Sequence, residues 1–194
     1  MRVIAGKYRS RPLRSLRGMD TRPTSDRLRE TLFNVLSAGN PEALAGTVWL
    51  DLFSGTGAVG IEALSRGAKQ VYFVESSAPA ADLIRRNLRS LGIGDCFRIV
   101  QQQLPIALRG LPGSITADLV FLDPPYRMEG DYGKTLEALA ESTLIHPRSV
   151  VIAEHEKKFD PGEAFGNLRR FRVLEQGSAA LSFYRLGNAS EKPA

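Results

Sequence analysis

The chain has 194 residues, 43% of them hydrophobic, and a net charge of +5. This suits one globular domain with a small appendage, because no apolar run approaches the roughly 18 residues of a membrane span. The residues after Met1 lack a signal-peptide pattern, the single cysteine excludes an internal disulfide, and the two histidines form no metal-binding cluster. We therefore expect a cytoplasmic protein without a metal or a membrane partner, and a monomer by default.

The positive charge is concentrated at the amino end. The first 29 residues hold nine Lys or Arg and two acidic residues, whereas the remainder holds 17 basic and 19 acidic ones. The stretch "RVIAGKYRSRPL" mixes β-formers with turn residues, as in a short strand pair. We interpret residues 1–22 as a basic, β-hairpin-like extension that binds a polyanion. A solvated tail and a transit peptide are the alternatives.

The next elements alternate along the chain. Pro23 and the polar residues after it predict the start of a helix whose apolar stripe runs from Leu28 to Leu36, and Gly39 to Pro41 end it. Strands are then expected at 47–53, 70–75, 97–101, 117–123 and 149–155, with helices at about 57–66, 78–91, 103–109 and 132–142 between them. Two further strands flank Gly177 and Ser178, a hairpin signal.

This alternation predicts an α/β fold. The central strands are near-continuous apolar runs, as expected where both faces of a parallel sheet are covered. We expect a doubly wound, Rossmann-like sheet of seven strands with an antiparallel last strand, spanning residues 23–187, followed by a flexible tail at 188–194. Ligands bind beyond the carboxyl ends of the strands in such folds.

The stretch "DLFSGTGAVG" places a glycine turn directly after the first strand of this sheet. Gly55, Gly57 and Gly60 have the spacing of a dinucleotide-binding turn, and Glu75 lies where a ribose-binding acid is expected. Asp51 argues against NAD, since a pyrophosphate would meet a like charge. S-adenosylmethionine instead brings an ammonium and a sulfonium group. An acid at the helix N-terminus is the purely structural alternative for Asp51.

A second motif, "FLDPPYR", ends the strand at 117–123. The two prolines fix φ and remove two N–H donors, which leaves carbonyl oxygens in a rigid turn. Asp123 and the Pro124 carbonyl can accept both hydrogens of an exocyclic amine, while Tyr126 stacks on the ring. The motif therefore favours a planar base as the second ligand.

Together these motifs resemble the class I S-adenosylmethionine-dependent amino-methyltransferases. The run "TRPTSDRLRETLFNVL" is similar to the signature of RsmD-type enzymes, which methylate guanine N2 in bacterial 16S rRNA. The basic opening resembles their N-terminal β-hairpin, and the resemblance extends from about residue 2 to residue 186. It implies methylation at guanine 966 of the small ribosomal subunit.

The resemblance also implies roles for single residues. The S-adenosylmethionine site would comprise Asp51, Phe53, Gly55, Gly57, Gly60, Glu75, Ser76, Gln103 and Leu104. The acceptor site would comprise Asp123, Pro124, Pro125 and Tyr126, and the RNA contacts would be Lys7, Arg9, Arg11, Arg14, Arg22 and Thr24. Arg22 and Thr24 line the entrance of either the cofactor or the RNA. "QQQL" departs from the family pattern at Gln103, where an Asp or Asn is usual.

Three other functions remain open at the level of the sequence. An adenine-N6 methyltransferase acting on DNA or RNA would use the same acceptor motif, although no separate target-recognition domain is evident. An NAD-dependent oxidoreductase is disfavoured by Asp51. A non-catalytic RNA-binding module would have little use for Asp51, Glu75 and Asp123 at three strand ends.

Overall fold

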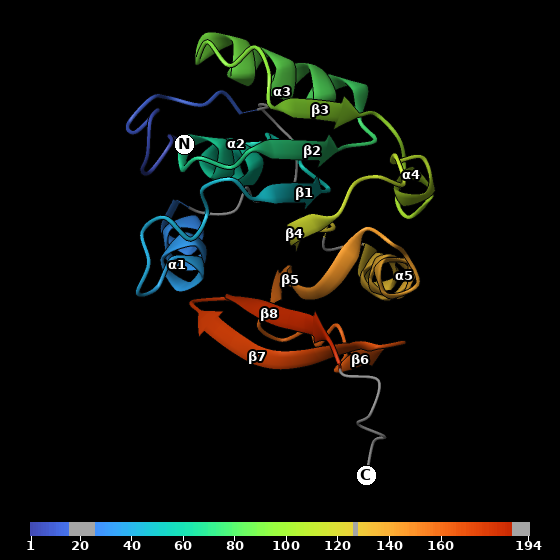
Figure 1. The fold of residues 1–194 in the computed structure, drawn as a ribbon. Helices are drawn as coiled ribbons and strands as arrows, with labels where there is room; N and C mark the ends of the chain where they lie inside the picture. The colour runs from blue at the N-terminus through green and yellow to red at the C-terminus, as the bar shows by residue number, and fades with distance from the viewer. Residues whose placement is uncertain (16–25, 126–127, 188–194) are drawn as a thin grey trace.

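A computed structural model describes residues 1–15, 26–125 and 128–187 of the chain. One sheet runs through the molecule with the strand order β3-β2-β1-β4-β5-β8-β7-β6 (Figure 1). Its strands are β1 (Val48–Leu52), β2 (Gln70–Val74), β3 (Phe97–Val100), β4 (Ala117–Leu122), β5 (Ile145–Glu156), β6 (Ala164–Phe165), β7 (Leu168–Gln176) and β8 (Ala179–Leu186). β1 to β5 are parallel, and β8 pairs with β5 in the antiparallel sense.

Helices cover both faces of the sheet. They are α1 (Asp26–Leu36), α2 (Ala58–Ser65), α3 (Ala78–Ser90), α4 (Ile106–Arg109) and α5 (Glu129–Ala140). The first three pack on the face that carries Trp49 and Phe121, whereas α4 and α5 pack on the face that carries Leu50 and Leu122. Two hydrophobic cores therefore hold the sheet, and its carboxyl edge stays available for a ligand. In the described part of the chain, no helix is long and apolar enough to cross a membrane.

The doubly wound fold expected from the sequence is confirmed, with one correction. The described sheet has eight strands rather than seven, because the two-residue strand β6 pairs with β7. So short a segment carries no alternation pattern that could announce it. The boundaries also differ: α5 begins at Glu129 rather than near 132, and β5 begins at Ile145 rather than at 149.

The basic extension pairs with itself as a hairpin. Val3 makes two backbone hydrogen bonds across it: its N–H donates to the Arg11 carbonyl at 3.0 Å, and its carbonyl accepts the N–H of Ser10 at 2.8 Å. Arg2 and Pro12 form a single antiparallel bridge rather than regular strands. The proposed domain boundary at residue 22 and the tail at 188–194 lie outside the described residues.

The extension is docked on α2 (Figure 1). The buried carboxylate of Glu62 accepts the N–H groups of Ile4 and Ala5 at 2.7 and 3.0 Å, and the N–H of Lys7 donates to the Ser65 carbonyl at 2.7 Å. A Cβ at Gly6 would lie 1.9 Å from the Ser65 carbonyl oxygen, so only glycine allows this approach. The extension is therefore fixed to the helix that follows the glycine turn.

Gly60 is expected to be irreplaceable for packing reasons. A Cβ at this position would lie 2.3 Å from Cε1 of Phe73, since α2 crosses closely over β2. Gly60→Ala should lower the free energy of unfolding by about 1–3 kcal/mol, as measured by urea denaturation. The matched control is Gly133→Ala inside α5, where the nearest contact would be an ordinary 3.9 Å and helix propensity favours alanine. Equal stability of the two variants would contradict the tight packing at Gly60.

Candidate active site

The glycine turn joins β1 to α2 at the carboxyl edge of the sheet. Its backbone enters the left-handed region at Phe53 (φ 58°), Gly55 (φ 53°) and Gly57 (φ 75°). Glycine adopts this conformation freely, whereas a phenylalanine is strained there by an amount of order 1 kcal/mol. The N–H of Gly57 donates to the Ser54 carbonyl at 2.7 Å, which closes the turn. A strained residue in a rigid turn is typical of a binding site.

Glu75 holds this turn from the neighbouring strand. It directly follows β2, and its two carboxylate oxygens accept the N–H groups of Gly55 and Ser77, each at 2.8 Å. A carboxylate has about four acceptor positions, so roughly two remain for ligand hydroxyl groups. Ser76 lies exposed beside it. The structure thus brings Glu75 and the glycine turn together, as the spacing predicts.

Asp51 is buried beneath the turn, with 1% of its surface exposed. Its Oδ2 accepts the N–H of Gly60 at 3.0 Å, in the first turn of α2. One carboxylate oxygen of Asp51 therefore has the structural role at the helix N-terminus that the sequence left open. Burial raises the pKa of Asp51 to about 8, against the lowering effect of the Gly60 N–H, and the charge of Glu75 raises it further.

The acceptor motif follows β4 at the same edge. Asp123 is tied to β1 through its N–H, which donates to the Leu52 carbonyl at 3.4 Å. Pro124 is buried and Pro125 exposed, and the Pro125 carbonyl accepts the N–H of Met128 at 2.7 Å. The two prolines restrict φ at their own positions. Tyr126 lies outside the described residues.

Asp123 is partly exposed as a whole residue, but its carboxyl group is desolvated. This desolvation raises the pKa of Asp123 well above its usual range, and the nearby charges of Glu154 and Asp51 raise it further. Like charges in a poorly solvated site resist joint ionisation. A positively charged group bound beside these acids would therefore be stabilised by their ionisation.

Glu154 is the functional candidate that the sequence interpretation missed. Asp51 pairs in register with Phe121 of β4, and Phe121 pairs with Ile152 of β5. Side chains alternate along a strand, so Asp123 and Glu154, each two residues further on, lie on the same face as Asp51. Glu154 is 3% exposed. An acid inside the apolar strand "SVVIAEH" was the available signal.

The two residues expected near an adenine ring, Gln103 and Leu104, differ in their exposure to solvent. Gln103 is exposed beyond β3, and its carbonyl accepts the N–H of Ala107 at the start of α4. Leu104 is only 6% exposed and packs in the core on the side of α4 and α5. Gln103 can therefore offer its side chain to a ligand, whereas Leu104 serves mainly to fix the loop. The Cα of Gly60, a third residue expected at the cofactor, packs against Phe73 of β2.

The extension contacts this site through Asn87 of α3, a second residue that the sequence interpretation did not single out. The fully buried Asn87 amide accepts the N–H of Arg14 at 2.9 Å and donates to the carbonyls of Arg14 and Thr56 at 3.2 and 3.1 Å. Thr56 belongs to the glycine turn. A polar residue on the apolar face of α3, between Ile84 and Leu88, was the signal.

The basic side chains assigned to RNA binding project outward where they are described. The exposed residues are Lys7, Arg9, Arg11 and Arg14, whereas Arg22 and Thr24 lie outside the described residues. Arg29 of α1 is fully buried and donates both to the Arg2 carbonyl and to Asp26. Part of the signature run, "DRLRE" at residues 26–30, therefore anchors the extension. No group of three or more potential metal ligands occurs in the described ranges.

Comparison with known proteins agrees with this geometry. Residues 1–185 match the model of the protein family described as Conserved hypothetical protein 95. The chain belongs to this family. The resemblance to RsmD-type enzymes that the motifs indicated is thereby confirmed.

Relatives in this family have similar lengths. The Bacillus subtilis protein named "Putative rRNA methyltransferase YlbH" is 31% identical over 186 residues, 95% of this chain and 98% of the relative. "Ribosomal RNA small subunit methyltransferase D" of Escherichia coli K12 is 34% identical, with 95% of this chain and 89% of the relative covered. The solved structure of "Putative methyltransferase yhhF" from Escherichia coli superposes with a TM-score of 0.80 at 28% identity and covers 97% of this chain and 98% of its own. The methyltransferase fold is therefore established.

Proposed function

We propose that the chain transfers a methyl group from S-adenosylmethionine to the exocyclic N2 amine of a guanine in 16S rRNA, at guanine 966 of the small ribosomal subunit. The enzyme would act as a cytoplasmic monomer. The observation that carries the proposal is the position of four acids, Asp51, Glu75, Asp123 and Glu154, towards the carboxyl ends of four adjacent strands. They are near enough for the charge of Glu75 to raise the pKa of Asp51 and for the charges of Glu154 and Asp51 to raise the pKa of Asp123.

These acids fit S-adenosylmethionine better than a dinucleotide. When bound, S-adenosylmethionine supplies a methyl group on a sulfonium centre. Glu75 would accept the ribose hydroxyls, and the open amide groups of the glycine turn would face the methionine portion. Asp51 and Asp123 would face its positive charges, and a cation beside them lowers their raised pKa values towards ionisation. A pyrophosphate at the same edge would bring further negative charge beside these acids in place of a cation that favours their ionised form.

Asp123 and the Pro124 carbonyl would orient the acceptor amine. The N2 lone pair of guanine is delocalised into the ring, which makes N2 a poor nucleophile. Two acceptors that take its hydrogens favour a pyramidal nitrogen whose lone pair points at the methyl carbon. As the methyl group is transferred, with S-adenosylhomocysteine as the leaving group, Asp123 would stabilise the positive charge that develops on nitrogen, and the extra proton on nitrogen would pass to Asp123 or to water. Positioning can supply up to roughly 7–11 kcal/mol of the barrier.

Guanine suits this site better than adenine. The Watson–Crick edge of guanine presents N1–H and N2–H donors side by side, whereas adenine places the acceptor N1 beside its amine. An edge built from carboxylates and a carbonyl favours adjacent donors. Adenine-N6 methylation remains the alternative, since Asp123 with its raised pKa can be protonated and donate to adenine N1. The basic extension would offset part of the few kcal/mol needed to extrude the base, through phosphate contacts.

The direct test is nucleoside mass spectrometry of 16S rRNA from cells with and without the gene. We expect N2-methylguanosine to disappear in the deletion strain and to return with the plasmid-borne gene. Transfer of labelled methyl groups by the purified protein should then be compared on naked 16S rRNA and on assembled small subunits. A deletion that instead removes N6-methyladenosine would replace guanine by adenine as the substrate. An unchanged nucleoside profile, with no transfer in vitro, would refute the proposal.

Cofactor affinity should rise with pH because of Asp51. Its pKa of about 8 in the free protein keeps much of the carboxyl protonated at neutral pH, and bound S-adenosylmethionine favours the ionised form. Binding should therefore release protons at pH 7, and affinity should level off above pH 8. Calorimetry in buffers of different ionisation enthalpy measures this release. Asp51→Asn should reduce it, and proton release equal to that of the wild type would contradict the assignment to Asp51.

A further inference from the structure

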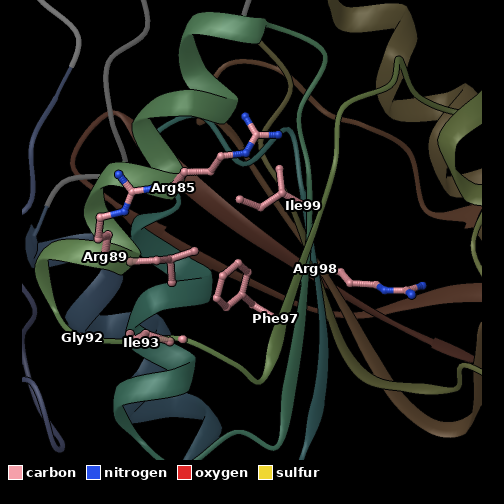
Figure 2. A pocket seen from close by; sticks show the side chains of 9 residues that line it. Arg85, Arg89, Gly92, Ile93, Phe97, Arg98 and Ile99 are labelled. Atoms are coloured by element: carbon pink, nitrogen blue, oxygen red, sulfur yellow. The ribbon is translucent and has the colours of Figure 1, made fainter.

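A groove of about 680 Å³ lies along the outer edge of the sheet, between α3 and β3 (Figure 2). The side chains that matter here are Arg85, Leu88, Arg89, Ile93, Phe97 and Ile99. The groove differs from the methyl-transfer site, because Phe97 begins β3, whereas Glu75 and Asp123 follow the carboxyl ends of β2 and β4. Nothing in the proposed reaction uses it.

The floor of the groove is apolar and incompletely covered. β3 is the edge strand, and in the part of the chain that the structure describes no strand pairs with its outer side. Phe97 and Ile99 are half-buried on the α3 face of β3. Figure 2 shows the Phe97 ring turned towards α3 and Arg98 extended away from it. Phe97 is thus partly exposed in the groove, with the rest of the residue packed against the core.

Arginines form the rim on the α3 side. Arg85 and Arg89 are exposed and four residues apart, so they lie one turn apart on the same side of the helix. Arg85 contacts Asp82 at 2.6 Å, with both side chains substantially exposed. An exposed ion pair of this kind contributes little to stability, so a bound anion can replace Asp82 as the partner of Arg85.

The positive charge continues from the rim into the basic extension. Nη2 of Arg11 donates to the Ser90 carbonyl at the end of α3, at 3.1 Å. Lys7 lies within electrostatic reach of Cys96, the residue before β3. Lys7, Arg11, Arg85, Arg89 and Arg98 thus surround this edge, and the acids near them are Asp82 and Asp95. The groove and the extension form one basic surface.

We propose that this groove binds a single-stranded segment of the RNA substrate, with a base against Phe97 and phosphates at Arg85 and Arg89. The inference rests on the proposed function, because it assumes that RNA is the substrate. An aromatic platform beside arginines is how proteins hold unpaired nucleotides without reading their sequence. The groove would add a second anchor, remote from the target base, to the contacts made by the extension.

The test compares RNA binding by three variants of the full chain. Arg85→Ala/Arg89→Ala should weaken binding of 16S rRNA and of a single-stranded oligouridine, and the slope of log Kd against log salt should fall by about 1.4, since each single-strand phosphate contact contributes about 0.7. Phe97→Leu keeps an apolar floor and should weaken oligouridine binding at least about fivefold without changing the slope. The matched control is Arg148→Ala/Lys158→Ala, two exposed basic residues on other elements.

The outcomes separate the groove from the proposed function. Cofactor affinity by calorimetry should be the same in all variants, which guards against misfolding. Groove variants that bind RNA like the control variant, while the wild type binds RNA and methylates it, would overturn the groove proposal alone. Groove variants that bind RNA normally but no longer associate with small subunits would assign the groove to a ribosomal protein and also overturn it. Wild-type protein that neither binds nor methylates RNA would overturn the proposed function itself.

Discussion

Asp123→Ala is expected to abolish methyl transfer, with kcat reduced at least about 10³-fold, while S-adenosylmethionine still binds. In the proposed reaction Asp123 would accept a hydrogen of the amine and balance the positive charge that develops on nitrogen. Asp51 and Glu75 would also bind the cofactor, so removal of Asp123 should leave cofactor binding largely intact. Removing one carboxylate also relieves repulsion with Asp51 and Glu154, so the variant should fold. Single-turnover transfer of labelled methyl groups measures the rate, and calorimetry measures the affinity.

Two variants sharpen this experiment. Asp118→Ala is the matched control, because Asp118 lies on the same strand β4 but at its opposite end, where it accepts the N–H of Val48. It should keep wild-type turnover. Glu154→Gln should shift the acid limb of the pH–rate profile to lower pH, since the charge of Glu154 contributes to the raised pKa of Asp123. Turnover of Asp123→Ala at the wild-type rate would remove Asp123 from the reaction.

Glu75→Ala is expected to weaken cofactor binding about 10²-fold. The variant loses the acceptors proposed for the ribose hydroxyls, and charge-assisted hydrogen bonds contribute about 1.5–3 kcal/mol each. It also frees the N–H groups of Gly55 and Ser77, so the glycine turn loses its tie to β2. The dissociation constant for S-adenosylhomocysteine, measured by calorimetry, reports the loss.

The controls for Glu75 distinguish local from general effects. Glu75→Gln keeps one acceptor oxygen and the shape of the side chain, so it should lose only about tenfold in affinity. Glu42→Ala removes an exposed acid from the α1–β1 connection and should change nothing. RNA affinity should be unaltered in all three proteins. If Glu75→Ala binds S-adenosylhomocysteine like Glu42→Ala, Glu75 does not hold the ribose.

Features that depend on residues close together in the sequence were predicted correctly. The alternation of apolar runs and amphipathic stretches predicted the order of the helices and of every strand except the two-residue β6, because burial on two faces dictates composition. The positive φ values at Gly55 and Gly57 agree with the turn that their spacing predicts. The strand ends carrying Asp51, Glu75 and Asp123 followed from the same alternation.

Features that depend on contacts between distant residues were missed or only half understood. Glu154 lies 31 positions after Asp123 along the chain, and only the parallel pairing of β4 with β5 brings the two acids together. A polar residue on the apolar face of α3 marks Asn87 in the sequence, but its partners Arg14 and Thr56 lie on separate elements and follow only from the packed structure. Asp51 accepts the N–H of Gly60 in the first turn of α2, and the sequence left this role open as an alternative to cofactor binding.

The amino-acid sequence thus specified the order of the elements, the glycine turn and the acceptor motif, because each depends on neighbours along the chain. The pKa of about 8 at Asp51, the meeting of four carboxylates and the docking of the extension on α2 came from the packed structure. Burial and strand register arise only when strands pair and helices cover them, and together they bring acidic residues that are far apart in the sequence to one edge of the sheet.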